Sequence, residues 1–136
     1  MTTSSYNFKD GEGPVPAHKH PNGGGWVADT ATVADTAYVG PEAKVYGNAK
    51  VYGNAWVKGN ARVSDNAEVL DYAWVSDNAR VFGDAGVFGG AWVSDNARVF
   101  GDAQVSGGAW VSGNAEVFGN AQVSGNAEVS GNRTLK

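Results

Sequence analysis

Residues 43–60 read AKVYGNAKVYGNAWVKGN, which is one unit of six residues repeated three times with small variations. The same unit, A-x-V-x-[G/D]-[N/D], runs without interruption over residues 25–132 and gives 18 hexads. Val occupies the third position of all 18, and Ala opens every hexad except the first, which begins with Gly25. A short fixed period of this kind is typical of a solenoid, in which each unit packs on the next.

Each hexad has the chemistry of a short strand followed by a corner. In A-x-V the first and third side chains point to one side of an extended strand, so Ala and Val face inward and x faces outward. Gly, Asn and Asp in the last two positions accept a positive φ angle at low cost and suit a tight corner. Three hexads then close one triangular coil of 18 residues. The sequence predicts an all-β fold, a parallel β-helix of about six coils over residues 25–132.

The hexads also carry a family resemblance. VADTA at residues 27–31 and VGPEA at residues 39–43 follow the signature [LIV]-[GAED]-x-x-[STAV]-x closely. They resemble the left-handed parallel β-helix of hexapeptide-repeat proteins, and the resemblance extends over residues 25–132. In later hexads an aromatic residue often follows Val, and in that respect the chain is similar to bacterial and phage proteins built from A-[R/W/K]-V-[Y/S/F]-G-N repeats. The resemblance implies a left-handed coil.

Two classes of enzyme come with this resemblance. Acyltransferases of the hexapeptide family place a catalytic His on or near a coil and interrupt the repeats with a loop that builds the acyl-donor cleft. The γ-carbonic anhydrases use three His ligands drawn from the coils and a neighbouring subunit. Residues 25–132 contain no His and no interrupting loop, so neither set of functional residues has a counterpart here. We therefore expect a structural or binding module without a cofactor, and keep the two enzyme classes as alternatives.

Side chains 18 residues apart lie above one another in such a solenoid, so each outward position forms a ladder. One ladder is aromatic, and three explanations fit it. Like rings stack on each other and stabilise the coils; the row forms a partner interface, because several exposed indoles make an apolar patch larger than most monomers leave bare; or the rings stack on a glycan or another ring-bearing ligand. The ladder consists of Tyr38, Trp56, Trp74, Trp92 and Trp110.

A second ladder, Arg62, Arg80 and Arg98, is cationic. Guanidinium groups about 5 Å apart repel each other, so each Arg needs a partner. The partner could be a neighbouring aromatic ring, a corner acid such as Asp84 or Asp102, a bound anion, or a second protein. Because Arg packs well on Trp and a threefold ring needs two complementary patches, we expect a homotrimer in which the Trp face of one subunit meets the Arg face of the next. Clefts between subunits would then suit a glycan or a small ring-bearing anion.

Both ends of the chain lie outside the repeat. Residues 1–24 are rich in Pro and Gly, and we expect them to form an irregular cap in which Tyr6, Phe8 and Val15 cover the first coil. Residues 133–136 are expected to form a short C-terminal tail. Acidic and amide side chains replace Trp and Arg in the last coil, and charge near an open edge discourages the addition of further strands.

His18 and His20 are the only histidines of the chain. An H-x-H pair on an extended segment places both rings on one side, which is a geometry that metal ions use. Two ligands do not close a site, so a carboxylate such as Asp29 or Glu42, or a neighbouring subunit, would have to complete it. The alternative is that both histidines are ordinary residues of the cap.

The composition of the chain argues against several further classes of function. The net charge of −4 argues against general affinity for nucleic acid, which requires a strong basic stripe. The chain has no Cys, so it can form neither a disulfide framework nor a thiolate metal site. No apolar run reaches the length of a secretory signal or a membrane helix, so we expect no membrane partner and a cytoplasmic location.

Overall fold

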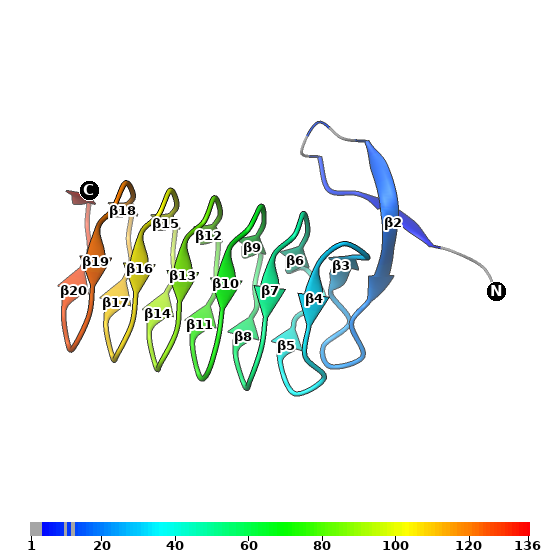
Figure 1. Ribbon diagram of the computed structural model, residues 1–136, viewed down its shortest axis with the longest axis horizontal. Coiled ribbons are helices and arrows are strands. Elements are labelled where there is room, and N and C mark those ends of the chain that lie inside the picture. The colour runs from blue at the N-terminus through cyan, green and yellow to red at the C-terminus, as the bar shows by residue number, and fades with distance from the viewer. Residues whose placement is uncertain (1–3, 10, 12) are drawn as a thin grey trace.

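A computed structural model of the protein describes residues 4–9, 11 and 13–136, and every regular element in this part of the chain is a β-strand (Figure 1). Residues 1–3, 10 and 12 of the expected cap lie outside the described residues. The strands form three sheets that run along the molecule. The first sheet contains β1 (Ser5–Asn7), β2 (Pro14–Lys19), β3 (Trp26–Ala28), β6 (Lys44–Val45), β9 (Arg62–Val63), β12 (Arg80–Val81), β15 (Arg98–Val99), β18 (Glu116–Val117) and β21 (Thr134–Leu135). The second contains β4 (Thr32–Val33), β7 (Lys50–Val51), β10 (Glu68–Val69), β13 (Gly86–Val87), β16 (Gln104–Val105) and β19 (Gln122–Val123). The third contains β5 (Tyr38–Val39), β8 (Trp56–Val57), β11 (Trp74–Val75), β14 (Trp92–Val93), β17 (Trp110–Val111) and β20 (Glu128–Val129).

The register of the strands is the 18-residue period of the sequence. Trp74 pairs in parallel with Trp92, and Val75 with Val93. The N–H of each coil donates to a carbonyl of the next coil, as from Trp74 N to Ala91 O at 2.9 Å. The fold class predicted from the repeat is therefore confirmed: the protein is an all-β parallel β-solenoid of about six turns.

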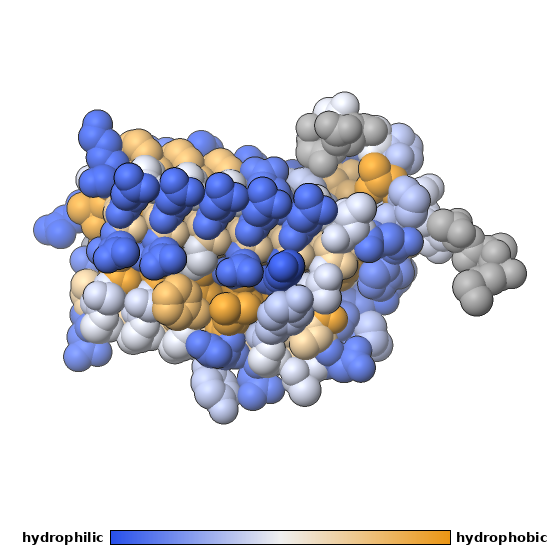
Figure 2. All heavy atoms as spheres, viewed as in Figure 1, coloured by the Kyte–Doolittle hydropathy of each residue, from blue (hydrophilic) through white to orange (hydrophobic). Residues whose placement is uncertain are grey.

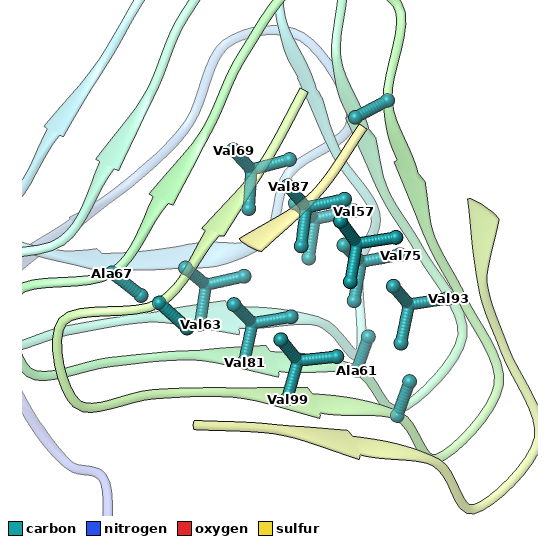
Figure 3. Packing of buried hydrophobic residues seen from close by; sticks show 14 of the residues in the cluster. Val57, Ala61, Val63, Ala67, Val69, Val75, Val81, Val87, Val93 and Val99 are labelled. Carbon is teal, nitrogen blue, oxygen red and sulfur yellow. The ribbon is translucent and has the colours of Figure 1, made fainter. Parts of the chain in front are cut away.

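The core is made of the Val and Ala positions of the hexads. Most of these side chains are fully buried, and Val columns from all three sheets point toward the solenoid axis (Figure 3). Because every coil has the same interior, the outer positions repeat as well, and like side chains line up in rows along the axis (Figure 2). We call the outer surface of the third sheet the Trp face and the outer surface of the first sheet from β6 onward the Arg face.

The corners explain why the fifth hexad position is Gly or Asp. This residue has a positive φ angle at most corners, for example +67° at Gly83 and +59° at Asp77. Asp is among the few residues besides Gly that visit this region readily, because its short side chain bonds to nearby backbone. Asp77 Oδ2 accepts the backbone N–H of Asp95 at 3.3 Å, and Asp95 Oδ2 accepts that of Gly113 at 3.0 Å. These carboxylates therefore link one coil to the next.

The N-terminal cap is more regular than the sequence suggested. Strands β1 and β2 form an antiparallel hairpin, and β2 continues antiparallel along β3 at the N-terminal end of the solenoid (Figure 1). Phe8 is buried in a cluster separate from the solenoid core, with Tyr6 and Val15 packed against it. The partners of this cluster include the outward-facing Trp26 and Tyr46. These hairpin residues thus pack on the outer side of the first two coils.

The C-terminal residues continue the stack. Strand β21 pairs in parallel with β18, with Thr134 opposite Glu116 and Leu135 opposite Val117. Thr134 and Leu135 follow the polar-then-apolar order of the two strand positions in each hexad. The first sheet therefore extends into the segment that was expected to be a tail.

Candidate functional site

The Trp face is a stack of rings. Trp56 and Trp74 lie 5.0 Å apart between ring centroids at 5°, and Trp74 and Trp92 lie 4.7 Å apart at 0°. Trp92 and Trp110 lie 5.0 Å apart at 2°, and Tyr38 stacks on Trp56 with a tilt of 32°. The exact register of the parallel strands brings the rings together, so the self-stacking explanation describes what the structure contains. The inner indoles have a ring against each face and turn mainly their edges to solvent.

The last indole differs from the others. The ladder position after Trp110 is Glu128, so a ring stacks on only one face of Trp110. Its exposed fraction is 48 %, against 38 % for Trp56, while Trp74 and Trp92 are half-buried. A ligand that stacks flat on an indole thus finds its best platform at Trp110 and little free ring face along the middle of the ladder.

Lys58 lies on the Trp face, and sequence reasoning did not give it a role. Its Nζ is 4.6 Å from the ring centroid of Trp74 and 5.8 Å from that of Trp56. A cation over an indole is attracted by the ring, so Lys58 stabilises the packing of Trp56 and Trp74. The signal available in the sequence was its position two residues after Trp56, where later coils carry Ser.

The Arg face carries three Arg side chains in register, followed in the same row by Glu116 opposite Arg98. Arg80 pairs with Arg62 on one side and Arg98 on the other, and Lys44 precedes Arg62 in the same row. Among the described residues none of the three Arg side chains forms an ion pair or lies over an aromatic ring. The internal partners considered from the sequence, the neighbouring rings and the corner acids, are thus not used. The rings of Phe82, Phe100 and Phe118 instead stack on one another at 4.8 and 4.9 Å.

The Trp and Arg faces meet at one corner of the prism. The order along the surface is Trp, Ser, Asn, Arg in two successive coils, at residues 74–80 and 92–98. The Asn side chains form their own ladder, with Asn78 accepting from Asn60 and donating to Asn96, both at 3.4 Å. The structure therefore places the two predicted ladders on neighbouring faces that meet at one edge of the solenoid.

The two histidines have different partners. His18 Nδ1 lies 2.7 Å from Asp29 Oδ1, and both side chains are about half exposed. His20 is buried, and its Nε2 lies 2.8 Å from Ala37 O, so it closes the open end of the first coil. Among residues 4–9, 11 and 13–136 there is no group of three His, Asp or Glu side chains arranged to hold a metal ion.

Comparison with known proteins supports the repeat. The model of a family described as YdcK beta solenoid repeat matches residues 43–59, 91–107 and 121–135. These segments amount to less than half of the chain, and in them the chain is similar to that repeat. No curated protein and no solved structure gives a significant match. None of the described residues forms a helix long and apolar enough to cross a membrane.

Proposed function

We propose that the protein is a non-enzymatic structural or binding module that assembles as a homotrimer through its Trp and Arg faces. One observation carries the proposal: Arg62, Arg80 and Arg98 stand in register, and none of them forms an ion pair in the described part of the chain, although Glu116 lies opposite Arg98. Such a row repels itself, and the repulsion is relieved when an acidic surface of a second molecule faces it.

The Trp face offers that acidic surface. Asp77 and Asp95 are exposed at the corner beside the Trp ladder, and each uses one carboxylate oxygen to accept a backbone N–H. The two carboxylates stand one coil apart, as neighbouring Arg residues do, so two Arg of one subunit can match the two Asp of the next. The Arg stems would lie across the indole edges and bury apolar surface there.

The ring geometry changes how Arg would meet Trp. Both faces of Trp74 and Trp92 are covered by neighbouring rings, and an indole edge carries positive rather than negative partial charge. Lys58 already approaches the Trp74 ring at 4.6 Å, so a guanidinium group from a second subunit gains little from the middle of the Trp ladder. The attraction between subunits would come from the Arg–Asp pairs and from apolar contact along the ring edges.

A second proposal is that clefts between subunits bind a glycan or another small ring-bearing ligand. The open face and 48 % exposure of Trp110 favour it, since an exposed indole face is a stacking platform for a ring. The Arg row of the neighbouring subunit would supply charge for an acidic ligand.

The repeat supports one further statement about origin and setting. We propose that the chain is a relative of hexapeptide-repeat proteins, similar in its A-x-V-x-G-N pattern to those of bacteria and phages, and that it acts in the cytoplasm. The uninterrupted hexads of residues 25–132 support the relationship.

Sedimentation equilibrium tests the assembly. We expect a wild-type trimer whose dissociation constant rises with salt, because ion pairs at an interface are screened. Arg80→Ala/Arg98→Ala and Asp77→Asn/Asp95→Asn should each weaken the trimer by about tenfold or more. The matched control is Gln104→Ala, on the second sheet, which should leave the trimer intact. Asn is chosen for the Asp positions because it also accepts a positive φ angle. A monomeric wild type, or a trimer indifferent to both double variants, would refute the proposal.

A further inference from the structure

A cleft of about 260 Å³ opens between the N-terminal hairpin and the first two coils, and none of the Trp and Arg ladder residues lines it. Its walls come from β2, from the corner after β3, and from the corner after β6. Most of the lining is apolar, and its polar part is small. The lining residues are Phe8, Val15, Pro16, Ala28, Asp29, Thr30, Tyr46 and Gly47.

The cleft exists because the first coil lacks the aromatic side chain that follows Val in most later coils of the first sheet. The position after Val is aromatic in four of the six coils of this sheet, beginning with Tyr46, but in the first coil it is Ala28. Phe8 from the hairpin stacks on Tyr46 at 4.9 Å and 19°, so it takes the place of the missing ring. Tyr6 also contacts Phe8 in an edge-to-face arrangement, with 4.8 Å between the ring centroids. The aromatic surface of the cleft is therefore packed and preformed.

One charged group stands at this apolar surface. Among the described residues that line the cleft, Asp29 is the only charged one. Its Oδ1 lies 2.7 Å from Nδ1 of His18, and because a carboxylate oxygen only accepts, Nδ1 is the donor of this bond. The pair is about half exposed, so Oδ2 is available to a ligand. His18 thus orients the carboxylate through Oδ1 and leaves Oδ2 as a second acceptor.

An apolar cavity with one oriented carboxylate fits one class of small molecule. A neutral apolar ligand would leave the carboxylate partly desolvated and without a new partner, and an anion would be repelled. A ligand with an apolar ring and a protonated amine satisfies both parts, since the ring packs against the accessible surface of Val15, Pro16 and Tyr46 and the ammonium bonds to Asp29. We propose that this cleft binds a small aryl- or alkylammonium compound, with Asp29 as its counter-ion.

The site is independent of the assembly proposed above. None of the residues of the Trp and Arg ladders lines it, and it lies at the N-terminal end of the solenoid. Success or failure of the trimer experiment therefore does not decide the fate of this proposal.

Titration of ¹⁵N-labelled protein with benzylamine tests the site. Benzylamine is protonated at neutral pH, and benzyl alcohol is its neutral counterpart of similar shape. We expect saturable amide shifts around Ala28, Thr30 and Gly47 with benzylamine, and binding at least tenfold weaker with benzyl alcohol, because the charged hydrogen bond is lost.

Two variants complete the experiment. Asp29→Asn keeps the size of the side chain and removes its charge, so it should abolish the preference for benzylamine over benzyl alcohol. Asp35→Asn, at the corresponding corner of the next hexad and outside the cleft, should bind benzylamine like the wild type. A retained amide spectrum shows that each variant is folded. The proposal is overturned if benzylamine gives no saturable shifts, if benzyl alcohol binds equally well, if Asp29→Asn keeps the preference, or if the shifts map to the Trp face.

Discussion

Removing a ring from the middle of the Trp ladder should cost more stability than removing the ring at its end. Trp74 is stacked on both faces, at 5.0 Å by Trp56 and at 4.7 Å by Trp92, whereas Trp110 is stacked on one face. A stacked pair contributes about 0.5–1.5 kcal/mol beyond its buried area. The stacking loss is then about 1–3 kcal/mol for Trp74→Ala and half of that for Trp110→Ala. The lower burial of Trp110 adds to the difference in the same direction.

Double-mutant cycles isolate the contact between rings. Trp74 and Trp92 touch, so their coupling energy should be about 0.5–1.5 kcal/mol. Trp56 and Trp92 stack on opposite faces of Trp74, and their coupling should be close to zero. The second pair is the matched control, since it contains the same residue type in the same ladder.

Guanidinium chloride unfolding followed by far-UV circular dichroism measures these differences without using Trp fluorescence. The curves should be recorded at two protein concentrations, because subunit dissociation makes apparent stability depend on concentration and ring stacking within one chain does not. Equal losses for Trp74→Ala and Trp110→Ala, or equal coupling in the two pairs, would refute the stacking argument.

Three further predictions concern the corners, the cap and the core. Gly83→Ala should lower the free energy of unfolding by about 1–3 kcal/mol, because φ is +67° and the new Cβ would lie 2.9 Å from a backbone N of the next coil. The control is Gly86→Ala, whose new Cβ would meet only ring atoms at 3.7 Å, and in thermal melts it should change the free energy of unfolding by less than about 1 kcal/mol. His20→Ala should raise hydrogen exchange in the first coil by an amount equivalent to about 1–3 kcal/mol and leave the last coils unchanged, because it removes the buried bond to the carbonyl of residue 37. Val75→Ala should cost about 2–3 kcal/mol by chemical denaturation and Val129→Ala clearly less, because the cavity at Val75 is closed by coils on both sides and that at Val129 lies in the last complete coil.

The hexad pattern was sufficient for the solenoid and its ladders. Val at the third position of every hexad leaves one way to bury the apolar side chains. A coil of 18 residues then follows from three strands and three corners. Once the coil length is known, the neighbour of Trp74 must be Trp92 and that of Arg80 must be Arg98. Local chemistry repeated at a fixed interval therefore determines long-range contacts, which ordinary sequences leave open.

The candidate site was predictable in its members and not in its contacts. The sequence places Trp and Arg on two neighbouring faces, but the tilt of the rings decides whether an indole offers its face or its edge. It also could not tell that Asp77 and Asp95 bond to the backbone or that Asp84 accepts from Asn66 at 3.2 Å while Arg80 has no acidic partner in the described residues. These outcomes depend on rotamers within a row, which the period does not specify.

Everything outside the period was decided by tertiary structure. Residues 4–9, 11 and 13–24 have no repeat, so nothing in their sequence tells which part of the solenoid they contact. The hairpin lies on the outside of the first coils because Ala28 leaves a space above Tyr46 that Phe8 fills. The cleft beside Asp29 arises from that packing. By itself, the sequence determined the stacked coils, because a repeated local preference fixes the register between strands. The cap and its cleft could be seen only in the folded chain, because contacts that occur once leave no periodic signal in the sequence.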